Sequence, residues 1–251
     1  MTDSPLLSII TIVKDDRNGL AKTLNSVATQ KQDWCEYVVI DGASTDGTLE
    51  VICQGAGSID TVISEEDSGI ANAFNKGINR ARGQYFLFLN AGDTLCTDVL
   101  KSVRNTLLEA STHGIWVVAS RVRLLVGAEG RLVGMPVSRR RQLLRNYLPH
   151  QGMLIASEAF RHLGPYDESY YLGMDYEWSL RLYHSWYRLQ FINIVLAEMN
   201  AEGISMKFYK KTFQAYHQAR LKHRMMPSLL SRLVTIFFIA KRTAGERLRN
   251  R

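Results

Sequence analysis

The chain has 251 residues, a length that suits one large domain or one domain with an appendage. Its hydrophobic fraction of 46% and charged fraction of 22% are ordinary for a globular protein, so it can bury a substantial core. Three widely spaced cysteines, Cys35, Cys53 and Cys96, give neither a metal knuckle nor a disulfide framework, and they favour a reducing compartment. The N-terminal MTDSPLLSIITIV has no basic segment before its apolar residues, which is typical of a first strand rather than a signal peptide.

The net charge of +7 conceals an asymmetry along the chain. Residues 1–202 carry 19 Lys/Arg and 23 Asp/Glu, a net charge of −4, whereas residues 203–251 carry 12 Lys/Arg and a single acid, a net charge of +11. A basic tail on a mildly acidic body predicts an anionic partner for the tail. Nucleic acid and membrane phospholipid are the two candidates that charge alone leaves open.

Predicted strands and helices alternate through the first third of the chain. Apolar or β-branched runs predict strands at 6–13, 37–40 and 61–64, and helical spacing of apolar residues predicts helices at 20–27, 48–53 and 70–81. Strand–helix units of about 30 residues predict a parallel sheet with helices on both faces. No GxGxxG follows the first strand and no GxxxxGK[ST] occurs, so the sequence does not favour a dinucleotide-binding or P-loop site.

A strand predicted at 85–89 (YFLFL) is apolar enough to be buried on both faces, and it ends abruptly in Asn90-Ala91-Gly92-Asp93. In open α/β sheets, ligands sit beyond the carboxyl ends of the strands. A carboxylate there can hold a divalent metal, which in turn can clamp a diphosphate. The alternative is an Asx-type turn. The second strand ends in residues 41–48 (DGASTDGT), where Asp41 could accept hydrogen bonds from a nucleoside, although an isolated block of this kind favours a simple turn.

Residues 41–48 and 65–93 (EEDSGIANAFNKGINRARGQYFLFLNAGD) resemble the nucleotide-sugar half of the family-2 glycosyltransferases, which have the GT-A fold. The LNAGD form is similar to that of bacterial exopolysaccharide transferases, such as those of colanic acid synthesis. The resemblance implies an α/β fold with a Rossmann-like, open, mostly parallel sheet and helices on both faces. We expect a catalytic domain at residues 1–205 and a basic helical extension at residues 206–251.

The resemblance also implies which residues contact the donor. Thr11 and the nearby main chain would line the base pocket, and Asp41 would contact the nucleoside. Asp67 and Lys76 belong to the block that borders the nucleotide.

The family's acidic metal motif falls on Asn90 and Asp93, and here the chain departs from the family. Asn90 replaces the usual first acid and Gly92 a usual middle acid, so one carboxylate remains. Phosphate oxygens and waters would complete the shell of a Mg²⁺ or Mn²⁺ ion held by Asp93.

Two later blocks carry the remaining candidates. His150-Gln151 resembles a feature of the same transferases, and a neutral His150 could ligate the metal or touch the diphosphate, or be an ordinary core histidine. Residues 170–177 (YYLGMDYE) resemble the acceptor-side block, in which the first turn of a helix carries the catalytic Asp. Met174 replaces the Glu that usually precedes it. Asp175 is the implied base that takes the acceptor's proton, and its alternative role is a helix N-terminal acid.

The segment between these blocks is harder to interpret. It predicts a helix at 99–108, a strand at 116–125 and a further strand or hairpin arm at 131–137. Arg139, Arg140, Arg141 and Arg145 lie close together, either as a solvated face or as a contact for phosphate or lipid headgroups.

The basic tail predicts two helices. One covers residues 208–223, Pro227 marks a break, and an apolar block at 229–240 follows, interrupted by Arg232. The block is too short for a membrane-spanning helix, and the basic residues after it favour an interfacial helix on anionic lipid. The alternative is a helix packed on the catalytic domain with a solvated basic end.

Taken together, these features predict a metal-dependent, inverting glycosyltransferase. It would move a sugar from a nucleoside-diphosphate-sugar donor to a hydroxyl of a glycan in bacterial exopolysaccharide or surface polysaccharide synthesis. The tail favours a polyprenyl-diphosphate-linked acceptor and a cytoplasmic protein, peripheral on the inner face of the bacterial plasma membrane. Inversion is implied by the resemblance alone.

Two other classes of protein fit parts of the sequence. A sugar nucleotidyltransferase on a related sheet would need a glycine-rich, basic loop after the first strand, whereas residues 14–19 (KDDRNG) contain one glycine and two acids. A nucleic-acid-binding protein would need exposed aromatic residues among its basic ones, whereas Phe237 and Phe238 fall inside an aliphatic block. We therefore expect no nucleic acid partner.

Overall fold

The computed structural model describes residues 4–127, 129–134, 136, 138–185, 188–201 and 203–249. Four strands form a parallel half-sheet in the order β3–β2–β1–β4, and they span Thr61–Ser64, Cys35–Asp41, Leu7–Val13 and Tyr85–Asn90. Apolar and β-branched runs buried on both faces explain why β1, β2 and β4 form central parallel strands, whereas β3 is the half-exposed edge strand. Val13 pairs with Asp41, and Ile12 pairs with Asn90, so the polar ends of β2 and β4 flank the end of β1.

The second half of the sheet is mixed. β8 (Met153–Ala156) pairs antiparallel with both β4 and β6 (Val117–Val126), and β6 pairs parallel with β9 (Leu189–Asn200). The short strands β7 (Glu129–Val133) and β5 (Thr94–Leu95) pair antiparallel with β6 and β9. The predicted open, mostly parallel α/β sheet is confirmed. The hairpin arm expected at 131–137 is β7, and positions 135 and 137 lie outside the described residues.

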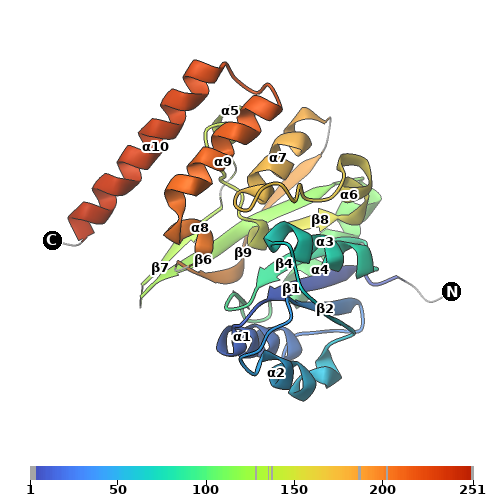
Figure 1. Ribbon diagram of the computed structural model, residues 1–251. Coiled ribbons are helices and arrows are strands. Elements are labelled where there is room, and N and C mark those ends of the chain that lie inside the picture. Colours follow the sequence, from blue (N-terminus) through green and yellow to red (C-terminus); the bar gives the residue numbers. More distant parts are fainter. Residues whose placement is uncertain are drawn as a thin grey trace.

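Helices cover both faces of the sheet, as predicted (Figure 1). One face carries α1 (Arg17–Ala28), α2 (Thr48–Gln54) and α4 (Val99–Thr112), and the other carries α3 (Ile70–Arg80), α6 (Ser157–Leu163) and α7 (Met174–His184). Strand β4 shows the alternation, because Leu87 and Leu89 pack into the first core whereas Phe86 and Phe88 pack into the second. Short helices complete the body at Ala56–Ser58 (η1), Arg139–Gln142 (α5) and His150–Gly152 (η2).

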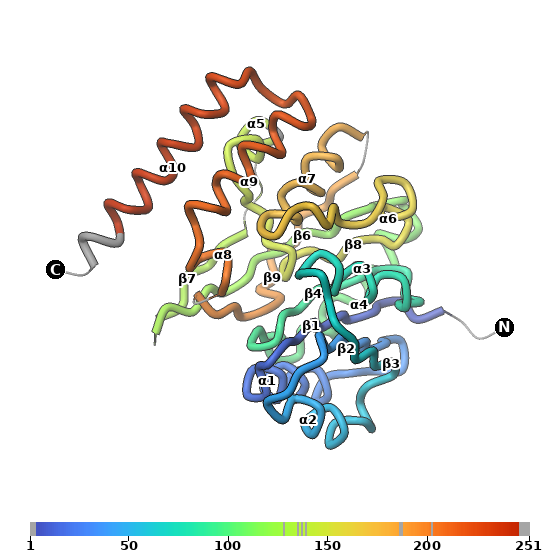
Figure 2. The backbone as a smooth tube through the Cα atoms, in the orientation of Figure 1, coloured from blue at the N-terminus to red at the C-terminus, as the bar shows by residue number. Residues whose placement is uncertain are grey.

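The C-terminal extension is a stack of helices on the α7 side of the body (Figures 1 and 2). It comprises α8 (Ile204–Lys207), α9 (Tyr209–Lys222) and α10 (Ser228–Arg249). Helix α9 packs on α7, and α10 packs on α9. The predicted helix at 208–223 and the break at Pro227 are confirmed. None of the helices among the described residues combines the length and hydropathy that a bilayer-spanning segment needs.

Helix α10 leaves a row of large apolar side chains on its outer face. The exposed fractions are 72% for Leu229, 49% for Leu230, 54% for Leu233, 53% for Ile236 and 59% for Phe237. We call these five residues the apolar row of α10. The opposite side of the helix is buried at Ser231 and Thr235, so α10 is packed on one face and apolar on the other.

Arg220 joins the extension to the body. Its side chain is 1% exposed, and it donates hydrogen bonds to Ser231 Oγ (2.8 Å) and Thr235 Oγ1 (2.6 Å) on α10. It also donates to the Leu144 carbonyl at 3.2 Å and lies 3.5 Å from the Tyr176 hydroxyl of α7. No carboxylate among the described residues forms an ion pair with Arg220. The guanidinium is therefore satisfied by neutral acceptors from three parts of the chain.

Arg220→Met is expected to lower the free energy of unfolding by roughly 2–3 kcal/mol, because buried hydroxyl and carbonyl groups lose a charged donor. Urea unfolding measures this change. Lys222→Ala is the control on the same helix, since Lys222 forms an exposed ion pair with Asp167 and lies 5.6 Å from the ring centroid of Tyr170, and it should change the stability by less than about 1 kcal/mol. Equal effects of the two substitutions would show that Arg220 does not anchor α10.

Candidate active site

The loops after β1 and β2 are joined by side-chain hydrogen bonds at the carboxyl edge of the sheet. Ser44 Oγ accepts a hydrogen bond from the Asp15 amide at 2.8 Å, and Asp15 Oδ1 accepts one from the Thr45 amide at 2.8 Å. Asp46 Oδ2 accepts from the Arg17 amide at 2.9 Å. Residues 41–48 are thus part of a fixed rim rather than an independent turn. Sequence reasoning did not single out Asp15, and its only signal was the acidic pair directly after the first strand.

Asp41 and Thr11 are both fully buried. Asp41 ends β2, and its Oδ2 accepts hydrogen bonds from Ser64 Oγ at 2.6 Å and the Ser44 amide at 3.2 Å. Thr11 lies inside β1 and accepts a hydrogen bond from the Tyr37 hydroxyl at 3.2 Å. Asp41 therefore lies at the carboxyl edge of the sheet and fixes the loop that follows β2. The Thr11 side chain is instead hydrogen-bonded within the core.

Asp67 lies against the same edge. A Cβ on Gly42 would come within 2.9 Å of Asp67 Oδ2, so the two residues are in close contact across the loops. Lys76 Nζ forms ion pairs with Asp67 Oδ1 at 2.8 Å and with Glu65 at 3.0 Å. Asp67 and Lys76, both predicted to border the nucleotide, therefore lie together, and the charge of Asp67 is paired with that of Lys76.

Asp93 is held by amide groups. Its Oδ2 accepts hydrogen bonds from Gln151 Nε2 at 2.8 Å and Asn90 Nδ2 at 3.1 Å, whereas its Oδ1 accepts none from the described residues. Burial raises the pKa of Asp93, and the hydrogen bonds from Gln151 and Asn90 lower it in opposition. The side chain is only 5% exposed. One carboxylate oxygen is thus fixed and the other is left for a ligand.

The turn that carries Asp93 explains one departure from the family motif. Gly92 has φ +91°, a left-handed conformation that an acidic residue would adopt only with strain. Thr23 of α1 holds the turn, because its hydroxyl donates to the Asp93 carbonyl at 2.6 Å and accepts from the Gly92 amide at 3.0 Å. Glycine at this position is therefore favoured by the backbone of the turn.

Asp175 lies in the first turn of α7, after Gly173, which has φ +78°. It is half-buried, and its Oδ2 accepts a hydrogen bond from Asn146 Nδ2 at 2.7 Å. The Asn146 Oδ1 in turn accepts from Gln142 Nε2 at 3.0 Å and from the Leu148 amide at 3.2 Å, which sets the direction of the amide. Sequence reasoning missed Asn146, because nothing local links it to a residue 29 positions away.

His150 is within electrostatic reach of both acids. It is 6% exposed, its Nδ1 has no hydrogen-bond partner among the described residues, and its ring packs edge-on to Phe74 at 5.2 Å. Burial lowers the pKa of His150, and the charges of Asp175 and Asp93 both oppose this shift. Asp93 and Asp175 therefore act on the same imidazole, and the structure brings the two predicted acids into one site.

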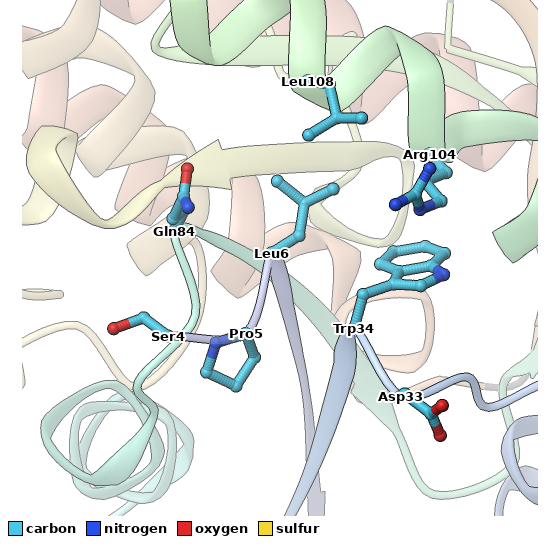
Figure 3. A pocket seen from close by; sticks show the side chains of 8 residues that line it. All are labelled: Ser4, Pro5, Leu6, Asp33, Trp34, Gln84, Arg104 and Leu108. Carbon is cyan, nitrogen blue, oxygen red and sulfur yellow. The ribbon is translucent and has the colours of Figure 1, made fainter. Parts of the chain in front are cut away.

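A surface pocket of about 440 Å³ lies at the other edge of the sheet (Figure 3). It is lined by Ser4, Pro5, Leu6, Asp33, Trp34, Gln84, Arg104 and Leu108. Leu6, Trp34 and Gln84 directly precede β1, β2 and β4, so the pocket sits at the amino ends of the parallel strands. It contains none of the predicted site residues, and ligands of open α/β sheets bind at the opposite edge.

The chain is similar to known proteins in sequence and in fold. A family model described as glycosyl transferase family 2 matches residues 8–160. An uncharacterized glycosyltransferase of Mycobacterium tuberculosis is 30% identical over 185 residues, which cover 72% of this chain and 70% of the relative. A Bacillus subtilis protein named for teichuronic acid biosynthesis is 36% identical over 110 residues, covering 43% of this chain and 44% of the relative.

Two solved structures share the fold. Staphylococcus aureus TarS in complex with UDP-GlcNAc superposes with a TM-score of 0.68 at 15% identity, covering 93% of this chain and 71% of that one. A mannosyltransferase of Pyrobaculum calidifontis in complex with GDP-Man and Mn²⁺ gives a TM-score of 0.67 at 18% identity, covering 90% and 66%. The fold and the family match define the chain as a glycosyltransferase, and the predicted GT-A fold is confirmed. The chain belongs to glycosyl transferase family 2.

Gln151→Leu is expected to raise the pKa of Asp93 further, because it removes an amide that stabilises the buried carboxylate. A carboxyl whose folded pKa exceeds its unfolded value stabilises the fold below the unfolded pKa, and this contribution is lost as pH rises through the folded pKa. The free energy of unfolding of the variant should therefore fall more steeply with rising pH than that of the wild type. Urea unfolding at a series of pH values, starting near the ordinary aspartate pKa, measures the slope.

Gln54→Leu, an exposed change on α2, is the matched control and should leave the slope unchanged. In an Asp93→Asn background, Gln151→Leu should no longer alter the slope. A persistent effect there would assign the pH dependence to a group other than Asp93.

Proposed function

We propose that this glycosyltransferase inverts the anomeric configuration while moving a sugar from a nucleoside-diphosphate donor to a hydroxyl of a glycan. The observation that carries the proposal is the common site of Asp93 and Asp175, whose charges both act on His150. An inverting transfer needs one group that holds the leaving diphosphate and another that accepts the acceptor's proton. The two acids supply these separate roles within one site.

The donor site that we propose is the rim at the carboxyl ends of β1, β2 and β4. Its support is the clustering of Asp41, Asp67 and Asn90 at that edge, together with structural neighbours solved with UDP-GlcNAc and GDP-Man. Asp41 would contact the nucleoside, and Asp67 would border the nucleotide. Thr11 would contribute through main chain near the base, since its side chain is committed to Tyr37.

The residues at Asp93 suit a divalent metal. Among the described residues, no three His, Cys, Asp or Glu side chains form a cluster, so the protein would supply few ligands. Mg²⁺ in transferases is commonly held by one or two carboxylates together with substrate phosphates and waters. Asp93, through its free Oδ1, and Asn90 would hold Mg²⁺ or Mn²⁺, which would neutralise charge on the departing diphosphate.

Asp175 is the proposed base. As the acceptor oxygen bonds to the anomeric carbon, the bond from that carbon to the diphosphate breaks, and the hydroxyl proton passes to the Asp175 carboxylate. Asn146 keeps that carboxylate in place through its 2.7 Å hydrogen bond. His150, kept neutral by burial, offers its unpartnered Nδ1 to a polar group of the donor or the acceptor.

Asp175→Asn should lower turnover by about 10²- to 10⁴-fold while leaving nucleotide binding intact, because it removes the proton acceptor alone. Asp93→Asn should instead weaken Mn²⁺-dependent nucleotide binding by roughly tenfold or more. Calorimetry with UDP and with GDP, in the presence and absence of Mn²⁺, measures binding, and release of the nucleoside diphosphate measures turnover. Unchanged turnover in Asp175→Asn would remove it from the role of base, and an unchanged Mn²⁺ effect in Asp93→Asn would remove the proposed metal site.

We also propose that the acceptor is lipid-linked, carried on polyprenyl diphosphate, in bacterial surface polysaccharide synthesis. Residues 206–251 would hold the protein to the anionic inner face of the plasma membrane, on the cytoplasmic side. The apolar row of α10 and its exposed Arg232 and Lys241 support this, because interfacial helices combine an apolar face with basic residues. Relatives named for teichuronic acid and for PGL/p-HBAD biosynthesis suggest surface glycans.

Leu233→Glu combined with Phe237→Glu should abolish flotation with phosphatidylglycerol vesicles, because it places two carboxylates in the apolar row. Leu49→Glu on α2 replaces another exposed leucine and should float like the wild type. Flotation of the double variant at the wild-type level would show that α10 is not the membrane contact. A gel shift of the wild type with DNA or RNA at the same salt concentration would favour nucleic acid as the partner of the tail.

A further inference from the structure

Arg145 lies beside the candidate site with no anion to neutralise it. Its side chain is exposed, and among the described residues no carboxylate lies within ion-pair distance of it. Its guanidinium lies 4.5 Å from the ring centroid of Tyr147 and 5.6 Å from that of Phe238. Two rings from distant parts of the chain therefore hold the cation in place, whereas a solvated arginine would sample many rotamers.

Arg145 is next in sequence to the residue that holds the proposed base. The next residue, Asn146, donates the hydrogen bond that holds Asp175. Burial raises the pKa of the Tyr216 hydroxyl, the charge of Asp175 raises it further, and the charge of Arg145 lowers it. Tyr216 therefore lies within electrostatic reach of both groups.

Arg145 also contacts Phe238 of α10, which packs against the apolar row. Phe238, which contacts the guanidinium, stacks on Phe213 of α9, with 5.7 Å between the ring centroids. It also packs against Phe237 at 5.2 Å, and Phe237 belongs to the apolar row. A carboxylate, a cation and an apolar surface thus follow one another along the molecule.

We propose that Arg145 binds the diphosphate of the lipid-linked acceptor, with the acceptor hydroxyl at Asp175 and the prenyl chain along the apolar row of α10. This inference rests on the proposed function. Such an acceptor carries its groups in the same order, with a sugar hydroxyl, then a diphosphate, then a hydrocarbon chain. The planar fork of arginine suits phosphate oxygens, and the Arg145 side chain is exposed. The donor diphosphate is expected at Asp93, with which Arg145 shares no hydrogen bond.

The test uses farnesyl diphosphate as a defined prenyl diphosphate and farnesol as the same chain without phosphate, both in detergent solution. Arg145→Gln should weaken farnesyl diphosphate binding by roughly 10- to 100-fold, because it removes a charged donor to phosphate, and should leave farnesol binding unchanged. Arg145→Lys keeps the charge without the fork and should give an intermediate loss. Arg141→Gln changes an exposed arginine of the same segment and should bind like the wild type.

Four measurements separate the possible outcomes. Arg145→Gln should bind UDP and GDP with Mn²⁺ like the wild type and float with phosphatidylglycerol vesicles like the wild type. Unchanged binding of farnesyl diphosphate by Arg145→Gln would overturn the inference. Lost flotation together with lost farnesyl diphosphate binding would overturn it in favour of a phospholipid headgroup contact. Failure of the wild type to release nucleoside diphosphate with any acceptor would count against the proposed function, whereas the prenyl diphosphate binding result would stand on its own.

Discussion

Two hydrogen bonds from amide side chains to carboxylates, both made by one short segment, hold the candidate site together. Within residues 142–151, Asn146 holds Asp175 at 2.7 Å and Gln151 holds Asp93 at 2.8 Å. A buried carboxylate such as Asp93 is costly unless donors satisfy it, and each of the two amides holds its carboxylate in place. His150, in the same segment, is within electrostatic reach of both acids. The segment sets the relation between the acceptor side and the donor side.

The sheet makes this bridge possible. Asp93 follows β4, and Gln151 precedes β8, the strand that pairs antiparallel with β4. The switch from parallel to antiparallel pairing brings the chain back to the carboxyl end of β4 just before β8 begins. Residues distant in sequence therefore meet at the edge where an open α/β sheet binds its ligands. Helix α7, packed on the second face, supplies Asp175 from its first turn.

Local patterns in the sequence were enough to predict the parallel half of the sheet and the edge position of Asp41 and Asp93. An unbroken apolar run such as residues 85–89 predicts a buried strand, and the polar residues after it mark the strand end. The contacts of the site were not predictable in the same way. Gln151 and Asp93 are 58 positions apart, and only the antiparallel pairing of β8 makes them neighbours. Thr11 shows the converse, because the family resemblance implies a site residue whereas its hydroxyl accepts a hydrogen bond from Tyr37 in the core.

The reduced acidic motif becomes intelligible once the amides are considered together with the carboxylate. Asn90 stands where the family usually has an acid, and here its amide donates a hydrogen bond to Asp93 Oδ2 at 3.1 Å. A carboxylate at position 90 could not donate this hydrogen bond when ionised, and its charge would repel that of Asp93. Gln151 donates to the same oxygen, so two neutral donors fix a single negative charge and leave Oδ1 available. A site with one charge instead of two or three attracts a metal less strongly, so the phosphates of the donor must supply more of its ligands. At the metal site that we propose, metal and donor would therefore bind cooperatively, each weakly without the other.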